Sequence, residues 1–256
     1  MVPMRRILAG VGVMCATALF AGAAGAAETV NITEAGFSPN QLGMPTNAFG
    51  SATITSTTGP VPSPISHVNV YGPAGVTLDL NGTGVCTEEA LRQRGPQACP
   101  ANSRAGFGGG QGIYQLGKEL VEEKYTLDFF LSDNRPGHTK LLIFLSGSTP
   151  VLVEIVLKGT VITGPKPYGL GFSVDVPPIK VLPEASNASA KTAFLTLGAR
   201  NVAYFRRVHG KRKLFHVKGI VLPKSCPRSG WPVASQFTFE DGSTVMAKRT
   251  IRCPRK

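Results

Sequence analysis

The sequence predicts an all-β protein, an antiparallel immunoglobulin-like β-sandwich with one short helix. Three observations predict this class. Short stretches of alternating or continuous apolar residues recur along the chain, which is typical of strands. The 256 residues include 30 Gly and 20 Pro, and both residue types favour the turns that join short strands. Only residues 87–93 combine helix-capping and helix-stopping signals.

The expected strands share apolar alternation or a short apolar run bounded by turn residues. They are residues 28–33, 51–57, 67–71, 76–80, 125–131, 140–145, 151–161, 170–176, 193–197, 202–205 and 214–222, and a closing hairpin of 235–240 and 244–251. The longest apolar run, 151–161, has one wholly apolar face and one mixed face, as in a strand at the core of a sandwich.

The expected helix has a defined beginning and end. Thr87 can cap the first turn, and Glu88 and Glu89 stand where the helix dipole favours negative charge. Gly95 and Pro96 then end the helix. We expect a short helix held against the sheets.

A candidate boundary lies at residues 177–190, where prolines precede a small and polar stretch. The chain then forms either one sandwich body over residues 27–256 or two fused sandwiches. We favour one body, because roughly 70 residues after the boundary would make a thin core.

The first 26 residues have the layout of a secretory signal peptide. Arg5 and Arg6 precede an apolar run, residues 7–20, and Ala24-Gly25-Ala26 is a cleavage pattern. A retained membrane anchor is the rival interpretation, but a spanning helix needs about 20 solidly apolar residues. We therefore expect a secreted or cell-surface protein with no transmembrane segment after signal removal.

Four cysteines remain after Cys15 leaves with the signal peptide: Cys86, Cys99, Cys226 and Cys253. An even number in an exported protein indicates disulfides, and four cysteines allow three connectivities. We favour Cys86–Cys99, which closes a loop bearing Gly and Pro, and Cys226–Cys253, which the closing hairpin brings together. We expect neither a metal site nor a cofactor, since no C-x-x-C pair or histidine at ligand spacing is present.

Two stretches carry a resemblance. One runs from Cys86 through the short helix to Cys99-Pro100-Ala101-Asn102-Ser103-Arg104-Ala105-Gly106. The other contains Cys226-Pro227-Arg228-Ser229-Gly230-Trp231-Pro232 and Phe237-Thr238-Phe239-Glu240-Asp241-Gly242, and it closes on Cys253-Pro254. Over about a quarter of the chain these stretches resemble uncharacterised exported β-rich proteins of high-GC Gram-positive bacteria. The resemblance implies an exported β-rich domain and brings no catalytic residues.

Positive charge is concentrated near the end of the chain. The net charge is +12, and residues 200–256 contain fourteen Lys and Arg against only Glu240 and Asp241, so residues 27–199 are close to neutral. Such asymmetry suggests contact with an anionic surface or polymer. The alternative is a basic face that serves only solubility.

The basic side chains gather on an expected hairpin with aromatic residues at its base and a turn at Val208-His209-Gly210. The candidate anion-binding residues are Arg206, Arg207, Lys211, Arg212 and Lys213. They could bind phosphate or carboxylate groups of an anionic cell-surface polymer, or lipid head groups. Export makes nucleic acid the less available partner. The alternative is a solvated hairpin whose lysines protect an edge strand.

No motif points to catalysis. The glycine-rich stretch 106–112 lacks the Gly-Lys-Ser/Thr ending of a phosphate loop, and we expect a flexible loop or bulge there. No G-x-S-x-G elbow is present, and Asp133 and His138 share one turn-rich loop instead of converging from distant segments. Glu122 and Glu123 should point to opposite faces of a strand. Trp231 is expected in the core.

Three hypotheses for function remain. The first is a binding or structural protein of the cell envelope or extracellular space, whose basic C-terminal third contacts an anionic polymer. The second is a secreted hydrolase with a site between the sheets or in residues 106–112. The third is a scaffold without a ligand.

Overall fold

The computed structural model describes residues 27–148, 150–198 and 202–254, and the expected signal peptide, 1–26, lies outside them. The all-β expectation is confirmed: every strand pairing is antiparallel. The strands in the described residues are β1 (Glu28–Ser38), β2 (Pro45–Ser56), β3 (Ile65–Pro73), β4 (Thr77–Asp79), β5 (Arg104–Leu116), β6 (Glu119–Asp133), β7 (Lys140–Gly147), β8 (Val153–Thr163), β9 (Tyr168–Asp175), β10 (Ser189–Leu197), β11 (Ala203–Val208), β12 (Lys211–His216), β13 (Gly219–Val221), β14 (Trp231–Phe239) and β15 (Thr244–Ile251).

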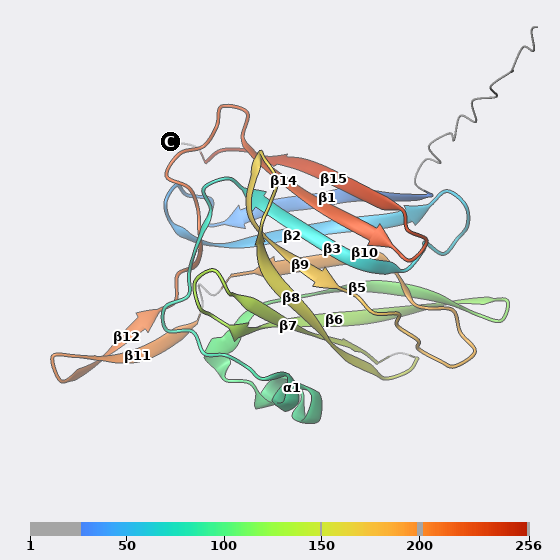
Figure 1. The fold of residues 1–256 in the computed structure, drawn as a ribbon, viewed down its shortest axis with the longest axis horizontal. Helices are drawn as coiled ribbons and strands as arrows, with labels where there is room; N and C mark the ends of the chain where they lie inside the picture. Colours follow the sequence, from blue (N-terminus) through green and yellow to red (C-terminus); the bar gives the residue numbers. More distant parts are fainter. Residues whose placement is uncertain (1–26, 149, 199–201, 255–256) are drawn as a thin grey trace, which may run out of the picture.

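One continuous sheet makes both layers of the sandwich. Its strand order is β15-β14-β3-β9-β8-β7-β6-β5-β10-β2, after which β2 pairs with β1 and with the short strand β13, which pairs with β4. β14, β15, β1, β2 and β3 form one layer and β5 to β8 form the other (Figure 1). The sheet nearly closes on itself, because Arg249 on β15 donates from Nη1 to the Ile32 and Thr33 carbonyls of β1, at 2.6 Å each.

The sheet passes between its layers at two glycine-lined corners. At the β5–β10 corner, a Cβ on Gly110 would overlap the Thr192 carbonyl oxygen. At the β3–β9 corner, a Cβ on Gly171 would overlap the Val70 carbonyl oxygen. Glycine is required at such close approaches of backbone to backbone.

Of the flexible loop or bulge expected at residues 106–112, the loop is wrong, whereas the pairing is irregular between Arg104 and Gly106 and opposite Gln111 and Gly112. These residues belong to β5 and pair with β6 on one side and β10 on the other. The repeated glycine removes the side-chain alternation that marks a strand, and it permits the bend of the sheet.

Strands on both sides of the candidate boundary at 177–190 belong to the same sheet. β10 follows the boundary and pairs with β2 and β5, which precede it. β14 likewise pairs with β3. The hydrogen-bonded ladders thus join the two parts of the chain.

The expected helix is α1 (Glu88–Arg94), followed by short 3-10 turns at Pro96–Ala98 and Ala101–Ser103. Thr87 Oγ1 accepts from the Ala90 amide at 3.2 Å. The fully buried Leu91 packs with Phe130 and with Leu142, Phe144 and Val156 on the outer face of β6, β7 and β8. An apolar patch outside the sandwich is thereby covered. No helix among the described residues has the length and apolar character needed to cross a membrane.

Both expected disulfides are present. Cys86 is bonded to Cys99 and Cys226 to Cys253, with Cα atoms 5.0 Å and 5.9 Å apart. The second bond ties the segment before β14 to the segment after β15. Trp231 is 1% exposed and meets Phe37 edge-on at 5.5 Å between ring centroids, so it belongs to the core. Disulfides fit a protein that folds in an oxidising, non-cytoplasmic compartment.

Candidate functional site

The five candidate anion-binding residues lie on one hairpin that projects from the body (Figure 1). β11 and β12 are joined by His209 and Gly210, with φ of 50° and 76°. Positive φ at both central residues is the requirement of a type I′ turn, the tight turn that matches the twist of a hairpin. The expected turn at 208–210 is confirmed.

Aromatic contacts fix the base of the hairpin. Tyr204 and Phe215 are cross-strand partners and stack at 5.8 Å between ring centroids. The Tyr204 ring also lies so close to Gly82 that a side chain at Gly82 would overlap it. Below this pair, the Val217 amide donates to the Val202 carbonyl at 2.8 Å. The hairpin is thus attached at one end and free at the other.

The cations of the hairpin face one another across the strands. Arg206 lies opposite Lys213, and Arg207 lies opposite Arg212. Like charges directly opposite in a sheet are destabilising. Among the described residues these four side chains and Lys211 form no ion pair with a carboxylate, although lysines elsewhere do. Carboxylates of the described residues therefore do not neutralise the positive charge of the hairpin.

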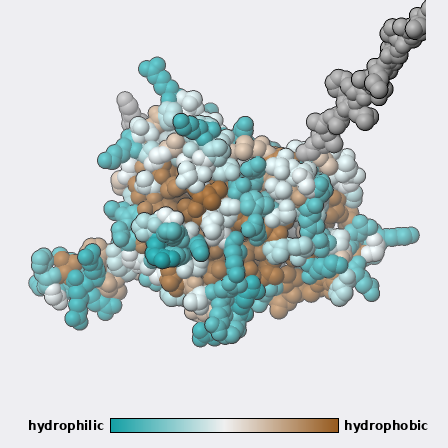
Figure 2. Space-filling view, in the orientation of Figure 1, coloured by the Kyte–Doolittle hydropathy of each residue, from teal (hydrophilic) through white to brown (hydrophobic). Residues whose placement is uncertain are grey.

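Two apolar side chains share the ribbon with the cations. Phe205 and Leu214 are cross-strand partners, 57% and 53% exposed. The Arg212 guanidinium carbon lies 3.8 Å from the Phe205 ring centroid, which is a cation–π contact. Figure 2 shows this projection covered mainly by hydrophilic residues, with a few hydrophobic atoms between them. Arginine held flat on a ring keeps its edge free to pair with a carboxylate or phosphate.

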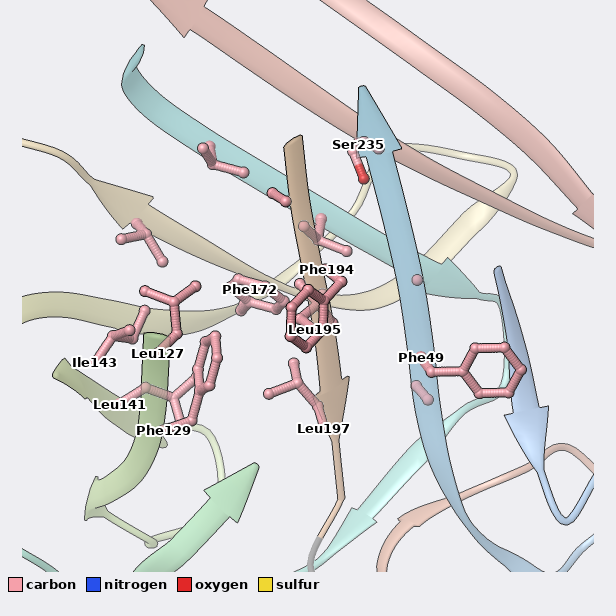
Figure 3. Close-up of a pocket in the computed structure, with 18 of the residues that line it drawn as sticks. Phe49, Leu127, Phe129, Leu141, Ile143, Phe172, Phe194, Leu195, Leu197 and Ser235 are labelled. Atoms are coloured by element: carbon pink, nitrogen blue, oxygen red, sulfur yellow. The ribbon is translucent and has the colours of Figure 1, made fainter. Parts of the chain in front are cut away.

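A second candidate site lies inside the sandwich. An apolar cavity of about 410 Å³, partly open to solvent, lies between the two layers. Figure 3 shows side chains from several strands converging on it. Its lining includes Leu127, Phe129, Leu141, Ile143, Phe172, Leu195 and Leu197.

The exposure of inward-facing residues agrees with the presence of this cavity. Leu127, Leu195 and Leu197 point between the layers, yet each is only half-buried. Protein interiors are normally packed as densely as organic crystals. Apolar side chains that border unfilled space lose the packing contacts that a dense interior would give them. A ligand would restore many of those contacts.

Three polar side chains on β5 and β6 line the cavity. Glu123 and Tyr125 come from the inward face of β6, and Tyr114 comes from the neighbouring β5. Tyr125 donates to the Thr192 carbonyl at 2.8 Å, and burial raises the pKa of its hydroxyl. Burial, together with the nearby Glu123 charge, also raises the pKa of the Tyr114 hydroxyl. As expected, Glu122 faces the other way, and it pairs with Lys191 at 2.5 Å.

A Ser–His–Asp row crosses β3 and β9, and no motif in the sequence indicated it. The Ser173 hydroxyl lies 3.1 Å from His67 Nε2, and His67 Nδ1 lies 2.7 Å from Asp175 Oδ1. The distances suit a nucleophile, a base and an orienting acid. The row nevertheless lies on the outer face of the sheet, and the Asp175 side chain is 90% exposed.

The surroundings of this row do not suit acyl transfer. In a triad the acid is buried and paired backbone N–H groups bind the oxyanion. β3 is paired with β14 and β9, and β9 with β3 and β8, so the ladders on both sides use the backbone donors of both strands. His67 Nε2 also lies 3.1 Å from Asn69 Oδ1, a second partner for that nitrogen. We interpret the row as a cross-strand polar ladder.

The loop that carries Asp133 and His138 holds no converging site. Asp133 pairs with Arg135 two residues away, and hydrogen bonds from this arginine lower the pKa of the carboxyl. His138 is exposed. Among the described residues, no group of three or more His, Cys, Asp or Glu side chains could hold a metal ion.

Comparison of the chain with protein-family models, with curated proteins and with solved structures found no match. The hairpin and the cavity are therefore the two candidate sites of the described residues.

Proposed function

We propose that the protein is exported and acts at the cell envelope, where the β11–β12 hairpin binds an anionic cell-surface polymer. The observation that carries the proposal is the set of cations on this hairpin, which face like charges across the strands and pair with no carboxylate in the described residues. A polymer of carboxylate or phosphate groups would relieve that repulsion.

The distribution of charge favours a polymer over a lipid surface. Arg206, Lys211 and Lys213 alternate onto one face of the ribbon, and Arg207 and Arg212 onto the other. An element that lies on a membrane separates an apolar face from a basic face. Cations on both faces suit a flexible chain that can follow the ribbon on either side.

The test is retention of residues 27–256 on isolated cell envelopes as salt is raised. We expect retention at low salt and release at high salt, because salt screens exposed charges over about 10 Å at 0.1 M. A variant with Arg206, Arg207, Lys211, Arg212 and Lys213 changed to Ser should stay in solution. Vesicles of phosphatidylcholine with phosphatidylglycerol should retain the parent less well than envelopes do.

A matched variant controls for net charge. Changing five exposed lysines of the body to Ser removes the same charge and leaves the hairpin intact; these are Lys118, Lys124, Lys166, Lys180 and Lys248. This variant should be retained like the parent. Equal loss in both variants would show that net charge alone is responsible, and stronger binding to the vesicles would replace the polymer with a lipid surface.

A further inference from the structure

The interior cavity has the composition of a ligand site. Its volume of about 410 Å³ lies within the range of 300–1,000 Å³ that is typical of small-molecule pockets. Its lining is mainly apolar, and Figure 3 shows Leu127, Phe129, Leu141, Ile143 and Phe172 among the side chains that form it. Tyr114, Glu123 and Tyr125 are the polar side chains that β5 and β6 contribute to this lining.

Charge limits what this cavity could hold. Among the described residues that line it, the only charged side chains are Glu34 and Glu123, and both are acidic. A carboxylate or phosphate group in an apolar interior needs a cation or several donors. The described residues of the lining include no Lys, Arg or His, so a fatty-acid anion or a phospholipid head group would have no cation to pair with there.

The buried Tyr114 hydroxyl lacks a hydrogen-bond partner among the described residues. Tyr114 is 1% exposed and lines the cavity. Buried polar groups in folded proteins are nearly always hydrogen-bonded, and an exception usually marks a bound water, ion or ligand. A phenol hydroxyl can donate to an oxygen and accept from a hydroxyl.

We infer that the cavity binds an uncharged, elongated apolar molecule that carries one hydroxyl or carbonyl oxygen, and that this oxygen hydrogen-bonds to Tyr114. The apolar body of the ligand lies among Leu127, Leu195 and the neighbouring aromatic residues. The ligand fills space that the protein's own side chains leave empty. This inference is independent of the proposed role of the hairpin and goes beyond it.

The test uses N-phenyl-1-naphthylamine, a neutral apolar dye whose emission rises when it leaves water. Residues 27–256 should bind it, and 1-dodecanol should displace it at pH 8 about tenfold more effectively than dodecanoate, because the carboxylate has no cation to pair with. The emission of Trp231, the sole tryptophan, reports independently whether each variant is folded.

Two kinds of variant test where in the cavity the ligand binds. Leu195→Phe and Leu127→Phe add bulk inside the cavity and should weaken dye binding, whereas Leu152→Phe makes the same change at a side chain that is 68% exposed and should not. Tyr114→Phe should weaken displacement by dodecanol about 3- to 10-fold, the range of one hydrogen bond, and leave dye binding unchanged.

Three results would overturn the inference. The first is a folded parent that does not bind the dye. The second is a folded Leu195→Phe variant that binds it as the parent does. The third is displacement by dodecanoate that equals displacement by dodecanol. Unchanged displacement by dodecanol in Tyr114→Phe would overturn the hydrogen bond to Tyr114.

Discussion

Arg207 and Arg212 face each other across the β11–β12 hairpin, and neither pairs with a carboxylate in the described part of the chain. The Arg212 guanidinium rests on the Phe205 ring instead. Repulsion between two arginines at paired positions destabilises the hairpin. A sequence selected for hairpin stability alone would place an acidic residue at one of the two positions. A substitution that stabilises the hairpin should therefore weaken anion binding, so the two effects can be measured separately.

The first prediction tests both effects. Arg207→Glu creates an opposite-charge pair with Arg212 and should stabilise the hairpin by about 0.2–1 kcal/mol. The same change should reduce retention on envelopes, because it replaces a cation with an anion. Hydrogen exchange of the hairpin amides measures the first effect, and the salt concentration of release measures the second. Lys166→Glu, on an exposed loop, is the control of equal charge. Unreduced retention in Arg207→Glu would contradict the proposed function.

The second prediction concerns the corners of the sheet. Gly110→Ala and Gly171→Ala each place a methyl group on a carbonyl oxygen of the next strand, Thr192 or Val70. Each should lower the free energy of unfolding by about 1–3 kcal/mol, the usual cost of overpacking. Urea unfolding followed by Trp231 emission measures the loss. Gly59→Ala is the control, since nothing lies within 4 Å of a Cβ there, and equal stability in all three variants would show that the corners tolerate a side chain.

These corners also show why one part of the fold escaped sequence reasoning. Alternation predicts β8, and capping residues predict α1, because both signals are local. Residues 106–112 of β5 are predicted to be a loop or bulge, because glycines carry no side-chain pattern. The need for Gly110 arises only when Thr192, far away in the sequence, packs against it.

The candidate sites divide in the same way. The hairpin could be predicted, because its cations, its aromatic residues and its turn are contiguous between residues 203 and 216. The cavity could not, because its lining comes from strands throughout the chain, and a hollow depends on how the layers are spaced. The row of His67, Ser173 and Asp175 depends on the register between β3 and β9, which no local pattern specifies.

The third prediction concerns this row. Because Asp175 is exposed and the backbone donors of both strands are used in ladders, we expect no labelling of Ser173 by a fluorophosphonate. Peptide mass mapping after incubation with the reagent measures the outcome, and Ser173→Ala is the reference. Stoichiometric labelling in the parent that is lost in Ser173→Ala would revive the hydrolase hypothesis.

The fourth prediction is a loss of stability in acid that originates at α1. Hydrogen bonds from Lys158 and then Arg92 hold the pKa of Glu88 below its usual value of 4.5. A carboxyl with a lowered folded-state pKa stabilises the fold above its unfolded pKa, and this contribution is lost as pH falls through the folded pKa.

Glu88→Gln measures that contribution. The variant should be less stable than the parent at pH 7 by less than about 1 kcal/mol, since exposed pairs are screened by solvent. The difference should shrink as the pH falls from 4.5 through the lowered folded-state pKa of Glu88. A difference that does not change with pH would show that Glu88 acts through packing and not through its charge.

The fifth prediction concerns the stability of the fold at high pH. Burial raises the pKa of Tyr125, and burial with the Glu123 charge raises that of Tyr114, so the fold favours both hydroxyls in their neutral form. Each contribution to stability is therefore present below pH 10, the usual tyrosine pKa, and is lost as pH rises through the folded-state pKa. Absorbance at 295 nm should show some of the five tyrosines ionising later in the folded protein than in urea.

Replacing each tyrosine in turn shows how much Tyr114 and Tyr125 each contribute to the loss of stability at high pH. Tyr114→Phe and Tyr125→Phe should each remove one late-ionising group and reduce the loss of stability above pH 10. Tyr125→Phe should also destabilise the fold at pH 7 by about 1 kcal/mol, because it removes the hydrogen bond to the Thr192 carbonyl. Tyr114→Phe should not, since its hydroxyl has no hydrogen-bond partner in the described residues. A loss at pH 7 in Tyr114→Phe as large as that in Tyr125→Phe would mean that the Tyr114 hydroxyl is already bonded within the protein, and this hydroxyl would then be closed to a ligand.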